Sequence, residues 1–322
     1  MRIGITYDIQ SDYSEYGGAV VDFSSYETIE FIRDTLISQG HSVELIGGFK
    51  KLCKFIADGG LERIDIIFNT AEGIISRNRE GFIPSLLEGL GFPYVGSDAY
   101  ALGLSLNKMH TKVMCSHLGI PTADYHEIRC KDDIPAALDK IGVPCVLKPN
   151  LEGTSGGVVL VKDAAAFAAE AEKLLAIYGP GILCEEYIDG REVVVPIIGT
   201  GADAEVIGVV ELVRVNGDPI EIFSLEDKQG DTVEKALPDI SDELRAKIHE
   251  ASLKIHNYLG CADYNRIDFR LTKDGGFSFI ELNGLPDMGE HSGYILGCTL
   301  YGRDYAKTFD EIICRAAKRW KK

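Results

Sequence analysis

Short apolar runs alternate with amphipathic stretches through the first third of the chain. Three β-prone runs predict strands: Ile3–Tyr7, Val43–Ile46 and Ile64–Phe68. Ser24 and Glu27 have the spacing of a capping box and predict a helix that ends at Gly40, and a further helix is predicted over Pro84–Leu90. Strands that alternate with helices form parallel sheets, which bind ligands beyond the carboxyl ends of their strands, where Asn69–Gly73 would lie.

The rest of the chain combines a glycine-rich loop, short strands and longer helices. The middle part predicts a helix after Gly96 that runs through Leu118, helices over Asp133–Ile141 and Ala164–Tyr178, and strands over Val143–Lys148, Val158–Val161 and Ile182–Ile188. This order predicts a small α+β unit. The last third predicts strands over Val193–Ile198 and Val206–Val215, an amphipathic helix from Ser241 to Leu259, a hairpin and a final helix with a basic end.

Composition narrows the class of protein. With 322 residues, 45% hydrophobic and 26% charged, the chain can fill two or three domains and is neither disordered nor fibrous. Its net charge of −17 argues against nucleic acid and anionic membranes as partners. The eight cysteines form no CxxC pair, and neither a signal sequence nor a long apolar segment is evident, so we expect reduced thiols and a cytoplasmic location.

A predicted hairpin near the C-terminus carries candidate metal ligands. If the Asp-Gly dipeptide at 274–275 is a two-residue turn, Asp268 faces Glu281 and Arg266 faces Asn283, with all four side chains on one face. Two carboxylates and a carboxamide are ligands that Mg²⁺ prefers. Alternatively, Arg266 simply neutralises the two carboxylates on an exposed sheet face.

Two further segments have features of a nucleotide site. Lys148 ends a predicted strand and precedes the flexible loop Gly153–Gly157, whose backbone N–H groups could converge on phosphate oxygens. The lysine precedes the glycines, so the loop is not a P-loop. The connector Cys184–Glu192 could border an adenine and reach ribose hydroxyls with a carboxylate. Each segment, taken alone, is equally an ordinary connection between strands.

These elements in this order resemble the ATP-grasp ligases, and within them the D-alanine–D-alanine ligases and their relatives. The resemblance also includes residues 91–97, 107–112 and 283–292, and it extends over most of the chain from about Glu80. It implies α/β and α+β folding in three domains: an N-terminal parallel βαβ domain (1–98), a small central α+β domain (99–187) and a C-terminal mixed-sheet domain (188–322). ATP would bind between the last two.

The resemblance also implies roles for particular residues in the nucleotide site. The phosphates of ATP would be bound by Lys108, Lys148, Lys228 and the loop residues Gly153, Thr154 and Ser155. The adenine would be bordered by Glu185, Tyr187 and Ile188, and the ribose by Glu192. Mg²⁺ or Mn²⁺ would be held by Asp268, Glu281 and Asn283, in agreement with the hairpin pairing.

The chemistry implied by the resemblance has two steps. A substrate carboxylate attacks the γ-phosphate to give an acyl phosphate, and an amine then displaces the phosphate. The catalytic residues would be Arg266, Lys228 and Ser155, with Arg266 and a backbone N–H near Asp287–Gly289 stabilising the oxyanion. Ser292 would hold the carboxylate of the second substrate. Arg266 could instead be structural.

The sequence departs from the D-alanine enzymes at positions near the substrates. Glu27 is the candidate for binding the first substrate's ammonium, but it is equally the acid of a capping box. Gln229 replaces a tyrosine that is usual in the family, and Asp287 replaces a common glycine. Arg77 and Arg79 could grip a substrate carboxylate, or lie in a solvated loop.

The sequence therefore predicts an ATP-dependent carboxylate–amine ligase that joins two small amino-acid-like substrates. By resemblance, these substrates would be two D-alanines, joined for cell-wall synthesis. A different amino acid, peptide or hydroxy acid pair is the first alternative. A non-catalytic nucleotide-binding protein and a small-molecule kinase are alternatives from other classes. A homodimer is an expectation at the level of the family.

Overall fold

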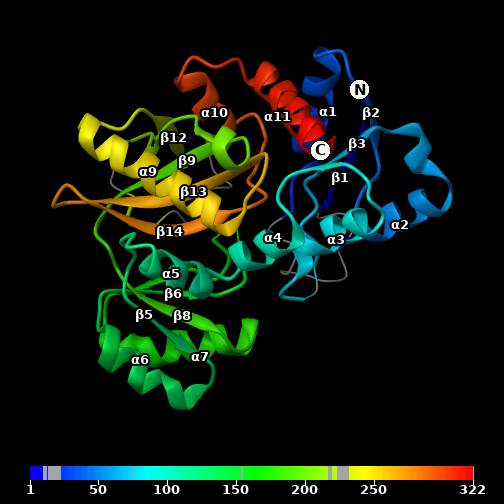
Figure 1. Ribbon diagram of the computed structural model, residues 1–322. Coiled ribbons are helices and arrows are strands. Elements are labelled where there is room, and N and C mark those ends of the chain that lie inside the picture. Colours follow the sequence, from blue (N-terminus) through cyan, green and yellow to red (C-terminus); the bar gives the residue numbers. More distant parts are fainter. Residues whose placement is uncertain are drawn as a thin grey trace.

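The chain forms three sheets, which Figure 1 shows side by side. The computed structural model describes residues 1–9, 13, 23–74, 76–153, 155–216, 220–222 and 232–321. The first sheet has the order β2-β1-β3-β4 and is parallel throughout, as predicted. Its strands are β1 (Arg2–Thr6), β2 (Ser42–Leu45), β3 (Ile66–Asn69) and β4 (Tyr94–Val95).

The helices α1 (Tyr26–Ser38), α2 (Phe49–Ala57) and α3 (Phe82–Gly89) accompany this sheet. The hydroxyl of Ser25 caps α1 by accepting from the backbone N–H of Thr28 at 3.2 Å. The expected cap, Ser24, was therefore wrong by one residue. Helix α2 was not predicted, because it begins after Gly48 and no side chain caps it.

The second sheet is antiparallel, with the order β5-β8-β6-β7. Its strands are β5 (Tyr125–Ile128), β6 (Cys145–Pro149), β7 (Val159–Val161) and β8 (Ile182–Glu186), and α6 (Ile134–Ile141) and α7 (Ala164–Tyr178) cover one face (Figure 1). The helix expected from Gly96 to Leu118 is two helices, α4 (Ala99–Leu106) and α5 (Lys108–His117). Asn107 is extended between them, and its side chain accepts from the backbone N–H of His110 to start α5.

The third sheet has the order β12-β11-β9-β13-β14. Its strands are β9 (Gly190–Ile198), β11 (Val210–Arg214), β12 (Val233–Ala236), β13 (Tyr264–Thr272) and β14 (Phe277–Asn283), and β10 (Glu205–Val206) pairs with β9. The sequence predicts a mixed sheet here, whereas all pairings between its named strands are antiparallel. The strand expected over Val206–Val215 is interrupted at Gly208, where a Cβ would lie 2.1 Å from the ring of Tyr301.

The remaining helices are α9 (Asp242–Leu259), α10 (Gly293–Leu300) and α11 (Tyr305–Arg319), with short 3₁₀ helices at Gly60–Arg63, Arg79–Gly81, Lys131–Asp133 and Gly201–Asp203. Helix α9 packs on the third sheet and α11 beside α1 on the first. The proposed domain limits fall between β4 and α4 and between β8 and β9. They stay a prediction. In the described residues, no helix is both long and apolar enough to cross a membrane.

The hairpin β13–β14 pairs Asp268 with Glu281 and Arg266 with Asn283, as predicted. The predicted two-residue turn was nevertheless wrong. Gly275 donates its N–H to Thr272 O at 3.1 Å and has a φ of +85°, which makes a three-residue turn. A register shift after Asp268 compensates for the extra turn residue. It restores the predicted pairing of Asp268 with Glu281 and of Arg266 with Asn283.

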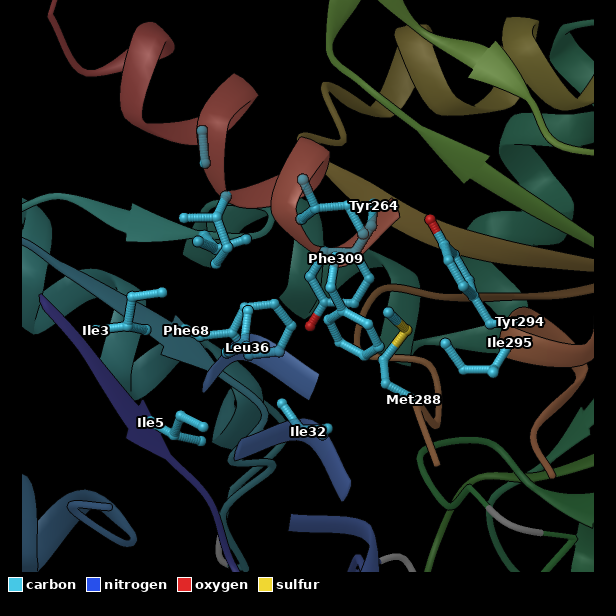
Figure 2. Packing of buried hydrophobic residues seen from close by; sticks show 14 of the residues in the cluster. Ile3, Ile5, Ile32, Leu36, Phe68, Tyr264, Met288, Tyr294, Ile295 and Phe309 are labelled. Carbon is cyan, nitrogen blue, oxygen red and sulfur yellow. The ribbon is translucent and has the colours of Figure 1, made fainter. Parts of the chain in front are cut away.

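A continuous apolar core joins the first and third sheets (Figure 2). Phe68 of β3 stacks on Tyr264 of β13 with ring centroids 5.6 Å apart, and Tyr264 also donates its hydroxyl to Asn69 O at 3.2 Å. Met288, in the segment after β14, and Phe309 of α11 belong to the same cluster. The segment that follows β14 is thereby held close to the first sheet.

Candidate active site

A cavity of about 110 Å³ lies between the second and third sheets. The second sheet contributes residues from β6, β8 and the glycine loop, and the third contributes residues from β9, β13 and β14. The described residues predicted for the nucleotide all line it: Lys108, Lys148, Gly153, Ser155, Glu185, Tyr187, Ile188 and Glu192. Thr154 and Lys228 lie outside the described residues.

Two lysines share one buried carboxylate in the wall of this cavity. Glu185 is 2.9 Å from Lys148 Nζ and 3.1 Å from Lys112 Nζ. Burial would raise the pKa of Glu185, but the two lysines outweigh it and the pKa is lowered. Burial also lowers the pKa of Lys112, which donates to the hydroxyl of Thr122 at 2.8 Å. Glu185 thus lines the cavity, with its carboxylate paired to two lysines.

The glycine loop is held in place from two sides. Lys108, the first residue of α5, donates to Glu152 O, and Arg79 Nη1 donates to Leu151 O at 2.8 Å. Ser155 has a φ of +58° and Gly157 one of +72°, so the loop turns sharply. The loop therefore lines the cavity, and the chain just before it is anchored at residues 151 and 152.

The predicted metal residues lie together on β13 and β14. Asp268 accepts two hydrogen bonds of 2.8 Å from Arg266 and one of 2.9 Å from Asn283 Nδ2. Glu281 lies 3.3 Å from Lys108 Nζ. Burial would lower the pKa of Arg266, but the carboxylates of Asp268 and Glu281 outweigh it and the pKa is raised.

The donors at this face are two carboxylates and one carboxamide. Within the described part of the chain, no three His, Cys, Asp or Glu side chains are grouped as they would be around a metal ion. A cation would therefore need oxygen atoms from a bound ligand to complete its coordination, which is how Mg²⁺ is usually held beside phosphates. The donor set fits such a cation.

A larger cleft of about 1080 Å³ adjoins the cavity. Five residues line both the cavity and the cleft and form a shared wall: Lys108, Gly153, Ser155, Glu192 and Glu281. The cleft also brings together Arg266, Asp268, Asn283 and the residues predicted for the substrates, namely Glu27, Arg79, Asp287 and Ser292. A ligand in the cavity and a ligand in the cleft would meet at the shared wall.

The residues predicted to bind the substrates differ in their burial and in their hydrogen-bond partners. Arg79 is buried, whereas Glu27 and Asp287 are exposed. The pKa of Glu27 is lowered, first by its own backbone N–H and then by the hydroxyl of Ser25. Asp287 accepts from the N–H of Gly289 at 2.8 Å, and Ser292 caps α10 by accepting from the N–H of Ile295 at 3.1 Å.

Two residues of the site were missed by the sequence analysis. Lys112 lies one helical turn after Lys108, and this spacing places both lysines on the same side of α5. Arg270 lines the cavity and lies on the same side of β13 as Arg266 and Asp268, because alternate residues of a strand share a face. Both could have been found from spacing alone.

Comparisons with known proteins identify the family of the chain. Residues 114–314 match the family model described as D-ala D-ala ligase C-terminus. The D-alanine–D-alanine ligase of Bordetella petrii is 29% identical over 89% of this chain and 85% of its own length. The uncharacterized protein y4sG of Sinorhizobium fredii is 30% identical over 87% and 84%. The structure of a Bacillus anthracis D-alanine–D-alanine ligase complexed with ATP has a TM-score of 0.77 at 24% identity and covers 100% of this chain and 99% of that one.

The fold and the site thus define an ATP-grasp ligase. The chain belongs to the D-alanine–D-alanine ligase family.

Proposed function

We propose that this protein uses ATP to join two small amino-acid-like substrates through an acyl phosphate, with D-alanine as the leading candidate for both. The observation that carries the proposal is the wall shared by the cavity and the cleft. At this wall the γ-phosphate of a nucleotide in the cavity would meet the carboxylate of the first substrate in the cleft. The acyl phosphate would form there as ADP is released, next to the amine of the second substrate. Such proximity replaces a bimolecular encounter by a step within one complex.

ATP would occupy the cavity. Lys148 and Lys108 would bind its phosphates together with the loop residues Gly153, Thr154 and Ser155, and Lys228 would add a further positive charge. The side chains of Tyr187 and Ile188 would border the adenine, with Glu185 behind them holding Lys148 in position. Glu192 would accept hydrogen bonds from the ribose hydroxyls. The ATP in the Bacillus anthracis relative supports this assignment.

Asp268, Glu281 and Asn283 would hold Mg²⁺ or Mn²⁺. The cation would offset the negative charge of the phosphate groups. Two carboxylates that face each other across neighbouring strands repel unless a positive charge lies between or beside them. Here the positive charges come from two side chains of the protein: Arg266 pairs with Asp268, and Lys108 pairs with Glu281. Both basic side chains line the cleft.

Arg266 would stabilise the oxyanion that forms when the amine attacks, together with a backbone N–H near Gly289. Its guanidinium is charged at any pH at which the protein would be active. The hydroxyl of Ser292 and the N-terminus of α10 would bind the carboxylate of the second substrate, since helix N-termini attract anions. Glu27 would bind the ammonium of the first substrate.

A second candidate is a ligase of the same kind that accepts another amino acid, a peptide or a hydroxy acid. It is favoured by the side chain of Asp287, which places a negative charge in the substrate cleft. D-alanine has no side-chain charge to pair with it, whereas Arg79 could bind the carboxylate of any amino acid.

A product survey tests the proposal. Purified protein would be incubated with ATP, Mg²⁺ and pooled D- and L-amino acids, with products identified by mass spectrometry and ADP release followed in parallel. We expect a D-alanyl-D-alanine mass that disappears when D-alanine is omitted. A different condensation product would identify the second candidate. Neither product nor ADP across a broad panel, despite nucleotide binding, would favour a non-catalytic protein, and a stable phosphorylated product would indicate a kinase.

A further inference from the structure

Arg270 is a buried arginine of β13 to which the roles above give no task. Only 7% of its surface is exposed, and it lines the nucleotide cavity. It pairs with Glu192 across β13 and β9, so the two side chains lie next to each other on the same face of the sheet. A buried arginine needs partners for its charge and for its five N–H donors.

The guanidinium of Arg270 joins three parts of the cavity wall. Its Nη2 donates to the backbone oxygens of Ile220 at 3.0 Å and Glu221 at 2.6 Å. The same nitrogen lies 3.4 Å from the hydroxyl of Tyr187, and the guanidinium carbon lies 5.4 Å from the centre of that ring. Nη1 is 3.6 Å from a carboxylate oxygen of Glu192.

One donor of Arg270 has no such partner. Among the described residues, none accepts a hydrogen bond from its Nε, although this atom is buried. Buried N–H groups in proteins are nearly always hydrogen-bonded. Because Nε is enclosed by protein, a ligand in the cavity would not reach it, and the role of Arg270 follows from the contacts of its two terminal nitrogens.

We propose that Arg270 is a positioning residue for the nucleoside half of the nucleotide. It orients the carboxylate of Glu192 toward the ribose hydroxyls and holds the ring of Tyr187 and the backbone of Ile220 and Glu221 around the nucleoside. The planar guanidinium can contact all of these groups at once, which a lysine ammonium cannot. The inference rests on the proposed nucleotide site and adds a residue to it.

The test compares ADP with 2′-deoxy-ADP, both with Mg²⁺ and without amino acids, by calorimetry on the full-length protein. We expect the wild type to bind ADP several-fold more tightly than the deoxy nucleotide, because Glu192 accepts from the ribose hydroxyl. Arg270→Met should weaken ADP binding by about tenfold, which is the size expected for losing charged hydrogen bonds, and should abolish the preference. Arg270→Lys should retain part of it.

Arg191→Met is the matched control. Arg191 neighbours Glu192 on β9 but points to the opposite face, where it pairs with Glu211 at 2.8 Å and donates to Asp239 O at 3.0 Å. It has the same kinds of partner as Arg270 and no contact with the cavity. We expect its ADP affinity and its preference for ADP over the deoxy nucleotide to equal those of the wild type.

The possible failures can be told apart. An Arg270→Met protein with wild-type affinity and preference would overturn the inference, and so would a variant with weaker binding but an intact preference, since that is the result of a purely structural role. A wild type that binds ADP without any preference would overturn it as well. A wild type that binds no ADP at all would overturn the proposed function itself.

Discussion

At the scale of single residues, the site depends on charges that are buried in groups. Glu185 binds two lysines and Asp268 binds an arginine, so each ion has a counterion in place. Removing one member of such a group leaves the other buried without a partner, which costs more than an exposed ion pair is worth. The sequence could identify Lys148 and Asp268 because they lie in recognisable motifs. It could not show that Glu185 contacts Lys112, since this contact joins a strand to a helix.

Arg79 allows a prediction about the substrates. Arg79→Ala should raise the KM for the amino-acid substrate about tenfold or more, because a charged hydrogen bond to its carboxylate is lost, while ATP affinity stays unchanged. Steady-state kinetics and calorimetry would measure the two effects. Arg77→Ala, an exposed neighbour in the same loop, is the control and should behave as wild type. Because Arg79 also donates to Leu151 O, weaker ATP binding with an unchanged KM would show that it serves the glycine loop instead.

His256 predicts a pH dependence of stability. Burial lowers the pKa of His256 to about 4, below the value of about 6.5 in an unfolded chain. Between these two pH values the unfolded chain binds a proton that the folded chain does not. The free energy of unfolding should therefore decrease as the pH falls from about 6.5 towards 4, by up to about 3 kcal/mol from this residue.

Urea unfolding at several pH values would measure this dependence. His256→Gln should flatten it in that range, whereas His110→Gln, at an exposed position of α5, should leave it as in the wild type. Equal slopes for wild type and His256→Gln would show that another group causes the loss of stability.

At the scale of elements, the sequence predicted what local patterns determine. Most of the strands and helices were found, and so was the pairing of Asp268 with Glu281, but the amphipathic helix α2 was missed. The pairing was correct although the turn was not, because the register shift after Asp268 offsets the third turn residue. Neither feature has a clear sequence signal. Similarly, the break at Asn107 depends on a local helix cap and the interruption at Gly208 on contact with the ring of Tyr301, and a periodicity pattern reveals neither.

At the scale of the whole molecule, the two ends of the chain share one core. The apolar cluster of the first sheet contains Ile3 and Ile5 of β1 as well as Phe309, Ile312 and Ile313 of α11. The nucleotide cavity, by contrast, lies between the second and third sheets. Stability of the first sheet and nucleotide binding should therefore respond to different substitutions.

Phe309→Ala tests this separation. Phe309 is fully buried and its ring centre lies 6.0 Å from that of Phe68, so the cavity left by alanine should cost about 3–5 kcal/mol. Hydrogen exchange should accelerate most in β1 and β3, while ADP affinity stays close to that of the wild type. Tyr305→Ala, on the same helix and 37% exposed, is the control. Faster exchange spread equally over all three sheets would contradict the prediction.

The position of α11 also matters while the protein is being made. The ribosome completes β1 before α11, and at about 5–20 residues per second the interval between them is roughly 15–60 s. During that time the first sheet lacks the helix that supplies Phe309, Ile312 and Ile313. Protease digestion of stalled nascent chains, lengthened so that residues 305–319 lie either inside or outside the ribosome, would show whether the sheet becomes resistant only once α11 has emerged. Synthesis of the first sheet therefore begins before that of the second and third sheets, and its packing is completed after theirs.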